Sequence, residues 1–209
     1  MLIGGLHRSS LIDYPGIISV VVFTQGCNFR CSYCHNPELV YPDAYRIPIP
    51  ENDVLLFLKR RARLLDGVVI SGGEALLQKD LRRFLKRIKA IGYPVKLDTN
   101  GSLPDVLTGV IRERLVDYIA MDIKAPFRKY EPVTGVRVDT DAVRESIRVI
   151  VESGVKYQFR TTKVDILLDD EDIKEIHEYI GNEACYVVQQ MNPYQGESHG
   201  GKPSAFSTR

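Results

Sequence analysis

Short runs of β-branched residues alternate with longer amphipathic segments along almost the whole chain of 209 residues. The runs predict strands at residues 18–23, 67–71, 95–99, 118–122, 157–162 and 184–190. The amphipathic segments predict helices at residues 52–65, 79–91, 103–114, 139–153 and 170–180. Strand–helix alternation at this spacing gives parallel strands joined by crossover helices. We therefore expect an α/β fold, and the pattern alone fits both an open doubly wound sheet and a barrel.

One core domain is expected over residues 1–191, because a chain of this length is most simply a single domain. Residues 1–15 precede the repeating units and are expected to form a leading strand or hairpin. Residues 192–209 are rich in Gly, Pro and Ser, which predicts a C-terminal loop or tail. The hydrophobic content of 44% is that of an ordinary globular protein with a sizeable core.

The net charge and the number of cysteines indicate which partners and which cellular compartment to expect. A net charge of +1 gives no reason to expect a nucleic acid or an anionic membrane as a partner. No apolar stretch approaches the roughly twenty residues that a membrane helix needs, and no targeting segment is visible at the N-terminus. Four cysteines without a signal peptide indicate a reducing compartment, so we expect a cytoplasmic protein.

Three cysteines follow the first predicted strand with the spacing C-x3-C-x2-C, at Cys27, Cys31 and Cys34. Three thiolates can hold three irons of a [4Fe–4S] cluster and leave the fourth iron open to a small molecule. A zinc site would add His35, but zinc modules usually pair two separate C-x2-C knuckles. The spacing favours the iron–sulfur interpretation, and a non-catalytic zinc-binding interaction module is the alternative of another class. Cys185 lies alone in an apolar run and is predicted to be a buried packing thiol.

Polar residues and glycines gather after each of the six predicted strands. Parallel α/β folds place their sites at the carboxyl ends of the strands, so one site ringed by six strands is expected. After the cysteines, the candidates along the chain are Gly72, Gly73, Glu74, Asp98, Thr99, Asn100, Asp122, Lys124, Arg160, Gln189, Gln190 and Asn192.

Several of these residue types suit a charged ligand. Gly72 and Gly73 allow backbone to approach a ligand closely, although paired glycines are also common in plain turns. Glu74 can accept hydrogen bonds from a cationic amine. Arg160 can hold a carboxylate by two parallel hydrogen bonds.

Other candidates have a competing structural interpretation. Thr99 and Asn100 suit ribose hydroxyls, but a strand-to-helix turn with an N-cap needs the same residue types. Asp122 and Lys124 share one face of their strand and form either a charge pair near a cofactor or a solvated salt bridge. Arg30 either adds positive charge near a cluster or is a surface charge.

The cysteine spacing, with Tyr33 directly before the third cysteine, resembles the signature of the radical S-adenosylmethionine (radical SAM) enzymes. Other segments are similar to the glycyl-radical-enzyme activases of this superfamily, above all to the activating proteins of anaerobic ribonucleoside-triphosphate reductase. These segments are residues 11–16, 34–37, 71–74, 99–101, 121–126 and 133–135. Ala75 stands where the family usually has proline, a departure expected to loosen the turn without removing a contact.

The resemblance implies a partial (β/α)6 barrel of the TIM type, with parallel strands inside and helices outside. It implies a [4Fe–4S] cluster held by Cys27, Cys31 and Cys34, with S-adenosylmethionine as the second cofactor. The residues that it implies for binding S-adenosylmethionine are Tyr33, Gly72, Gly73, Glu74, Thr99, Asn100, Asp122, Lys124, Arg160 and Gln190.

The activity that the resemblance implies is reductive cleavage of S-adenosylmethionine to a 5′-deoxyadenosyl radical. That radical would take a hydrogen atom from a glycine of a glycyl radical enzyme, the large subunit of anaerobic ribonucleotide reductase. Flavodoxin or ferredoxin would donate the electron. Two alternatives keep the chemistry and change the substrate: activation of another glycyl radical enzyme such as pyruvate formate-lyase, and synthesis of 7-carboxy-7-deazaguanine.

Overall fold

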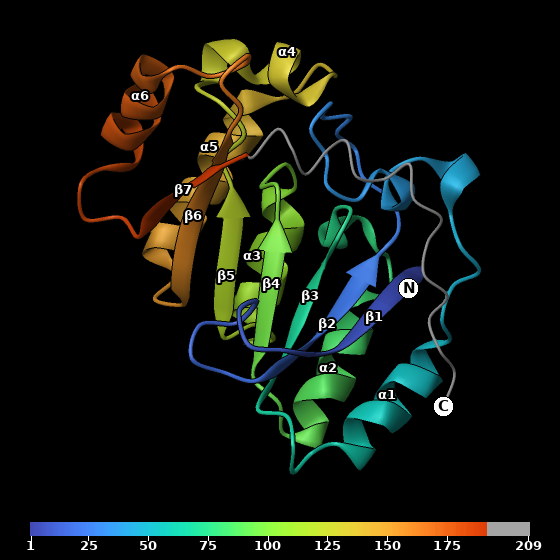
Figure 1. Cartoon of the computed structure of the whole chain (residues 1–209). Helices are drawn as coiled ribbons and strands as arrows, with labels where there is room; N and C mark the ends of the chain where they lie inside the picture. The colour runs from blue at the N-terminus through green and yellow to red at the C-terminus, as the bar shows by residue number, and fades with distance from the viewer. Residues whose placement is uncertain (192–209) are drawn as a thin grey trace.

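The structure is a computed structural model that describes residues 1–191, and its central sheet has seven strands in the order of the chain (Figure 1). Strand β1 pairs antiparallel with β2, and every later neighbour pair is parallel. The strands are β1 Ile3–Ser10, β2 Ser19–Thr24, β3 Gly67–Gly72, β4 Val95–Thr99, β5 Tyr118–Asp122, β6 Lys156–Lys163 and β7 Tyr186–Gln190.

Sequential strand order distinguishes the two architectures that the sequence left open. A doubly wound sheet reverses its strand order at a switch point, whereas β2 to β7 follow one another without a reversal. The expected partial barrel with parallel strands is thus confirmed. The leading segment contains β1, and the predicted tail and Asn192 lie outside the described residues.

Helices follow the parallel strands and cover one face of the sheet, which Figure 1 shows most clearly for α3 and α5 behind β4 to β6. The helices are α1 Glu51–Arg60, α2 Leu81–Ile91, α3 Pro104–Arg112, α4 Tyr130–Thr134, α5 Thr140–Glu152 and α6 Asp170–Ile180. The short helix α4 was not predicted. The first predicted helix, 52–65, is too long, because the backbone leaves helical geometry at Arg61.

The main core lies between the sheet and these helices. Ile70, Leu97 and Ile119 of three neighbouring strands are fully buried, as are Phe84 of α2 and Leu107 of α3. Alternate residues of a strand point to opposite faces, so one stripe of each strand supplies this core. The other stripe is then available for a second layer or for a site.

A smaller cluster covers part of the opposite face. Tyr14, from the loop between β1 and β2, packs with Val21 and Val69, and its ring lies 5.8 Å from that of Tyr118. Tyr118 is the first residue of β5, so this loop closes the amino-end half of the face. The carboxyl-end half is where the candidate residues lie.

Strand β7 is the exposed edge of the described sheet, since it pairs with β6 alone. Cys185, which directly precedes it, is exposed rather than buried as predicted. Val187 and Val188 are also substantially exposed. An apolar run therefore does not mark burial here, because the strand has a neighbour on one side only.

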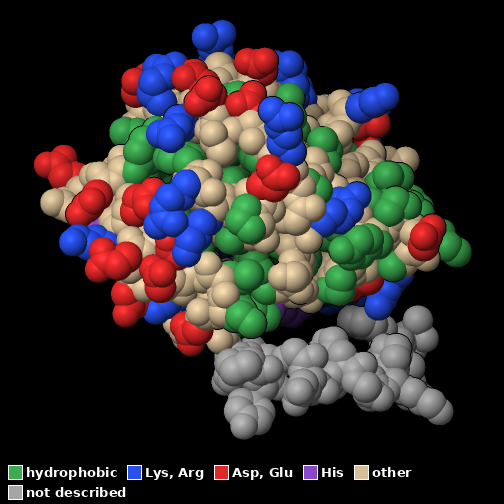
Figure 2. Space-filling view, turned by 90° about the horizontal axis from the view of Figure 1, so that it is seen from above, with side chains coloured by type: hydrophobic (Ala, Val, Ile, Leu, Met, Phe, Trp, Pro, Cys, Tyr) green, Lys and Arg blue, Asp and Glu red, His purple; other side chains and the backbone are tan. Residues whose placement is uncertain are grey.

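Among residues 1–191, no helix is both long and apolar enough to cross a membrane. Figure 2 looks down on the carboxyl-end face of the sheet, where acidic and basic side chains are interspersed with hydrophobic patches. This mixture agrees with the near-zero net charge of the sequence.

Candidate functional site

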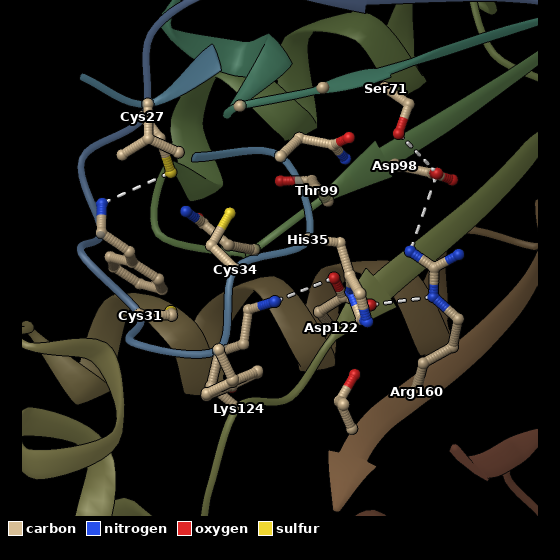
Figure 3. Close-up of a pocket in the computed structure, with 18 of the residues that line it drawn as sticks. Cys27, Cys31, Cys34, His35, Ser71, Asp98, Thr99, Asp122, Lys124 and Arg160 are labelled. Atoms are coloured by element: carbon tan, nitrogen blue, oxygen red, sulfur yellow. Dashed lines mark hydrogen bonds and ion pairs between the residues drawn. The ribbon is translucent and has the colours of Figure 1, made fainter. Parts of the chain in front are cut away.

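A cavity of about 330 Å³ lies at the carboxyl ends of the parallel strands (Figure 3). Of the thirteen predicted site residues, the structure places all except Glu74 and Gln190 in its lining. The residues come from the cysteine loop (residues 27–36) and from the ends of β3 to β6. These residues thus come together at the carboxyl ends of the strands, as expected from their positions in the sequence.

The cysteine loop begins three residues after β2, and its three thiols line the cavity while being only partly exposed. The Phe29 amide donates a hydrogen bond to Cys27 Sγ at 3.4 Å. Burial raises the pKa of Cys27 to about 11. Burial also raises the pKa of Cys31, against the opposing charge of Lys124. Both thiols are therefore protonated at neutral pH, and a metal would have to displace these protons to bind.

Within residues 1–191, no three His, Cys, Asp or Glu side chains are grouped so that they could hold a single metal ion. A [4Fe–4S] cube makes a different demand, because each cysteine binds its own iron. The buried hydroxyl of Tyr33 lies in the same lining and has no hydrogen-bond partner among these residues. A buried polar group of this kind is unusual unless a bound group satisfies it.

A row of alternating charges crosses the cavity from β4 to the end of β5. Lys96 donates to Asp98 at 2.6 Å, and a guanidinium nitrogen of Arg160 lies 3.7 Å from Asp98. Arg160 Nε donates to Asp122 Oδ1 at 2.8 Å, and Lys124 Nζ donates to Asp122 Oδ2 at 3.0 Å. The register pairs Asp122 with Arg160 on neighbouring strands, which sets their side chains on one face. Three cations and two carboxylates leave this row with one positive charge in excess.

These ion pairs keep Asp122 and Lys124 charged. Burial alone would raise the pKa of Asp122, but Lys124 and Arg160 outweigh it and lower that pKa to about 2. Burial would lower the pKa of Lys124, but Asp122 outweighs it and raises that pKa above its usual range. Both side chains are half-buried, with 18% of Lys124 and 31% of Asp122 exposed, and both line the cavity, which favours the charge pair over the solvated salt bridge.

Glu74 is fully buried and lies outside the cavity lining. Its Oε1 accepts hydrogen bonds from Thr99 Oγ1 at 2.9 Å and from the Leu76 amide at 3.0 Å. Its Oε2 accepts from the Asn100 amide at 2.7 Å. Glu74 was predicted to accept hydrogen bonds from the amine of a ligand, but here its donors belong to the protein itself. Glu74 therefore joins the turn after β3 to the turn after β4.

The turn after β4 also reaches the cysteine loop. Asn100 Nδ2 donates to Asn28 Oδ1 at 2.9 Å, and Asn28 Nδ2 donates to Ser102 Oγ at 2.8 Å. Helix α3 begins after Leu103, so Thr99 and Asn100 are not its N-cap. Both residues line the cavity, while their side chains bond to Glu74, Asn28 and Ser102 of the protein itself.

Gln190 does not line the cavity, and its neighbour Gln189 does. The side chain of Gln190 donates to Asp165 at 3.0 Å. Gln189 pairs with Thr162, which also lines the cavity, so the two share one face of the sheet. The alternation of faces along a strand explains why a shift of one residue reverses the direction of the side chain.

Several residues of the cavity lining were not among the predicted ligands. Ser71 donates to Asp98 Oδ2 at 2.9 Å, which links β3 to the row of charges. His35 and Asn36 extend the lining beyond the last cysteine, and Asp13 enters from the loop after β1. A face-by-face count would have found Thr162, which lies two residues after the predicted Arg160 on β6. Asp13 reaches the cavity from a loop, and a loop lacks the two-residue alternation that would have predicted this position.

Comparisons with known proteins give consistent relatives. Residues 21–181 match the sequence model of a family described as the radical SAM superfamily. The chain is 36% identical over 200 residues to a putative glycyl-radical enzyme activating enzyme of Methanocaldococcus jannaschii, covering 92% of this chain and 80% of that one. It is 31% identical over 204 residues to the pyruvate formate-lyase-activating enzyme of Clostridium pasteurianum, covering 93% and 83%.

Solved structures share the fold at low sequence identity. SuiB of Streptococcus suis bound to its precursor peptide SuiA matches with a TM-score of 0.67 and 18% identity, over 84% of this chain and 39% of that one. The protein anSMEcpe with bound AdoMet matches with a TM-score of 0.59 and 14% identity, over 80% and 49%. The chain thus spans less than half the length of either solved chain.

Proposed function

The chain belongs to the radical SAM superfamily and, within it, to the glycyl-radical-enzyme activating enzymes, and from this we propose that it cleaves S-adenosylmethionine and forms a glycyl radical on a partner protein. The proposal rests on one observation above all. Three cysteines of one loop line the same cavity as the Gly72–Gly73 turn and the half-buried pair of Asp122 and Lys124.

Cys27, Cys31 and Cys34 are the proposed ligands of a [4Fe–4S] cluster. Three sulfur donors leave one iron of a cube without a protein ligand. The amide of Phe29 on Cys27 Sγ fits such a site, because hydrogen bonds to sulfur tune the potential of a cluster. The unpartnered hydroxyl of Tyr33 also fits a bound group. A bound cluster would supply the one electron needed to cleave S-adenosylmethionine into methionine and a 5′-deoxyadenosyl radical.

The rest of the cavity is the proposed site for S-adenosylmethionine. Lys124 and Arg160 face it as cations and would hold the methionine carboxylate. Gly72 and Gly73 would present backbone groups to the ligand without side chains in the way. Asn100 would bind the ribose hydroxyls, and Gln189 takes the place predicted for Gln190.

The proposed partner is the large subunit of anaerobic ribonucleotide reductase, with flavodoxin or ferredoxin as the electron donor. The support is the similarity of residues 11–16, 121–126 and 133–135 to the activating proteins of that enzyme. The curated relatives are a putative activating enzyme without a stated target and an enzyme that activates pyruvate formate-lyase. Pyruvate formate-lyase and a small deazaguanine precursor are therefore the substrates to test beside it.

The test compares the wild-type protein with Cys31→Ala and Cys185→Ala, all purified without oxygen. Cys185 is exposed on the edge of the sheet and serves as the matched control. We expect about four irons and a visible iron–sulfur absorbance in the wild type and in Cys185→Ala, and neither in Cys31→Ala. A full set of irons in Cys31→Ala, or a colourless wild type with one zinc, would overturn the cluster assignment.

Substrate choice is read in the same preparations. Each is incubated with S-adenosylmethionine, a reductant and one candidate substrate. Formation of 5′-deoxyadenosine reports the cleavage, and the electron paramagnetic resonance doublet of a glycyl radical reports the target. We expect that doublet with the ribonucleotide reductase subunit. A doublet with pyruvate formate-lyase alone would keep the activase assignment and reject the proposed partner.

A further inference from the structure

The cysteine loop is held in place by a segment about a hundred residues further along the chain. The amide of Arg30, midway between Cys27 and Cys34, donates a hydrogen bond to the carbonyl oxygen of Thr134 at 2.7 Å. Thr134 ends helix α4, and Gly135 follows it. Neither Thr134 nor Gly135 lines the cavity, so this contact acts on the loop from its other side.

Gly135 is required at this contact for two independent reasons. Its φ of +70° lies in the left-handed region, where side chains other than hydrogen are strained. A Cβ built on it would also lie 2.6 Å from the carbonyl oxygen of Arg30 and 3.2 Å from its carbonyl carbon. The neighbour is backbone, which has no rotamer by which to give way. Any larger residue would therefore push the cysteine loop away.

The segment that carries Gly135 is itself firmly anchored. Thr134 is fully buried, and its hydroxyl donates to the carbonyl oxygen of Tyr130 at 2.7 Å. Tyr130 is also buried, and its hydroxyl accepts from the Lys124 amide at 3.3 Å. Lys124 lies two residues after the end of β5 and lines the cavity. The contact with Arg30 is thus fixed relative to the sheet.

Arg30 holds the loop from within as well. Its Nη1 donates to the carbonyl oxygens of Cys27 at 2.6 Å and of Phe29 at 2.8 Å, which fixes the curvature between the first two cysteines. Its guanidinium lies 5.4 Å from the centre of the Tyr41 ring, in cation–π range. The surface charge left open by the sequence is therefore a structural part of the loop.

We propose that Arg30, Tyr130, Thr134 and Gly135 form a loop clamp that holds the three cysteines in their ligand-bearing arrangement before any cluster is present. These are positioning residues, since they act on the cysteines through the backbone. What the cysteines bind rests on the proposed function, whereas the clamp itself is tested on the metal-free protein. Pre-organisation of this kind removes the entropy of ordering the loop from the cost of cluster binding.

The chain offers a closely matched control for Gly135. Gly154, which follows α5, has a φ of +71°, and a Cβ built on it would meet nothing within 4 Å. Gly135→Ala and Gly154→Ala therefore introduce nearly the same backbone strain. Only Gly135→Ala adds a collision with the cysteine loop, so the difference between the two variants isolates the clamp.

The experiment measures hydrogen exchange of the metal-free, reduced proteins, resolved at the Arg30 amide. We expect this amide to be protected in the wild type and in Gly154→Ala, and to exchange at least about tenfold faster in Gly135→Ala. Unchanged exchange of the Arg30 amide in a folded Gly135→Ala protein would overturn the clamp. If Gly135→Ala does not fold, Arg30→Gln tests the same idea, because it removes the side-chain bonds to the loop and should speed exchange at the hydrogen-bonded amides of residues 29 and 30, and unchanged exchange there would overturn the clamp.

A second measurement connects the clamp to the cluster. The same proteins are reconstituted with iron and sulfide without oxygen, and iron content is followed with time. Slower or incomplete loading of Gly135→Ala, with Gly154→Ala like the wild type, supports the clamp, and equal loading of all three opposes it. A wild type that takes up no iron while its Arg30 amide is protected would reject the proposed cluster and leave the clamp standing.

Discussion

Glu74 shows how one buried carboxylate can organise a site that it does not touch. It receives three hydrogen bonds from the turns after β3 and β4, and it contributes nothing to the cavity surface. Hydrogen bonds to a carboxylate favour its ionised form, whereas full burial opposes ionisation. Burial prevails, and the pKa of Glu74 is raised to about 7.

This raised pKa predicts an unusual dependence of stability on pH. The folded protein keeps the Glu74 proton up to about pH 7, whereas the unfolded chain loses it near pH 4.3. Between these two pH values the folded state therefore binds more protons than the unfolded state. As a result, the contribution of Glu74 to the free energy of unfolding falls as pH rises from about 4.5 to 7. We expect the wild type to lose on the order of 2 kcal/mol relative to Glu74→Gln over this window.

Urea unfolding of the metal-free, reduced proteins at pH 5 and pH 8 measures that difference. Glu74→Gln has nearly the same shape and no titratable group, so every other group of the protein cancels between the two. A difference that is flat with pH, or that grows in favour of the wild type at pH 8, would show that Glu74 is ionised throughout.

Arg160 lies in a row of charges in which every member faces an opposite charge. Removing its guanidinium leaves Asp98 with Lys96 and Asp122 with Lys124, and it abolishes the excess positive charge of the row. Arg160→Ala should then weaken binding of S-adenosylmethionine by about tenfold or more, or about 1.4 kcal/mol, with the iron content intact. Arg148→Ala, on the exposed face of α5, is the control and should bind as the wild type does. Equal dissociation constants in anaerobic calorimetry would remove Arg160 from the site.

At the scale of the elements, helix α6 packs on the core through Ile176 and is tied to the segment before α4 by a buried carboxylate. Asp172 accepts hydrogen bonds from Arg128 at 2.7 Å and from Lys129 at 2.6 Å. It also completes a capping box with Asp169, in which each side chain accepts from the backbone amide of the other. The same side chain thus starts the helix and ties it to the segment before α4.

Asp172→Asn should therefore lower the free energy of unfolding by about 1–3 kcal/mol, because it leaves two cations without their buried partner. Asp170→Asn is the matched control in the same turn of α6. Asp170 is highly exposed and, within residues 1–191, forms its ion pair with Lys163 at the surface, so its loss should cost under about 1 kcal/mol. Similar costs for the two variants in urea unfolding would mean that α6 is not attached in this way.

The elements were predictable from sequence to the degree that their pattern is local. The ends of β4 and β5 and the whole of α6 agree with the prediction to the residue, since period and capping residues define them. Helix α4 was missed because five residues between Pro126 and Gly135 are too short to show a helical period. The role of Glu74 could not be predicted either. It depends on two turns meeting across neighbouring strands, which no spacing within the chain reports.

At the scale of the whole molecule, the sheet is protected unevenly. Strands β3 and β4 each have neighbours on both sides, and Val69, Ile70 and Leu97 in them are fully buried. Strand β7 has one neighbour in the described chain, and four of its five residues are exposed. The cavity spans both parts of the sheet, because Thr99 lies on the central strand β4 and Gln189 lies on the exposed edge strand β7.

This difference predicts the order in which the sheet opens. Local opening has a low free energy where few apolar contacts must break, whereas central strands exchange only by larger unfolding events. In the metal-free protein, the amides of β7 should exchange more than about tenfold faster than those of β3 and β4, as measured by hydrogen exchange of peptides covering each strand. S-adenosylmethionine bound to the loaded protein should slow exchange in β7 if Gln189 contacts it, because opening the edge would then release the ligand. Protection of β7 equal to that of β4 without any ligand would show that the edge is closed by contacts beyond β6.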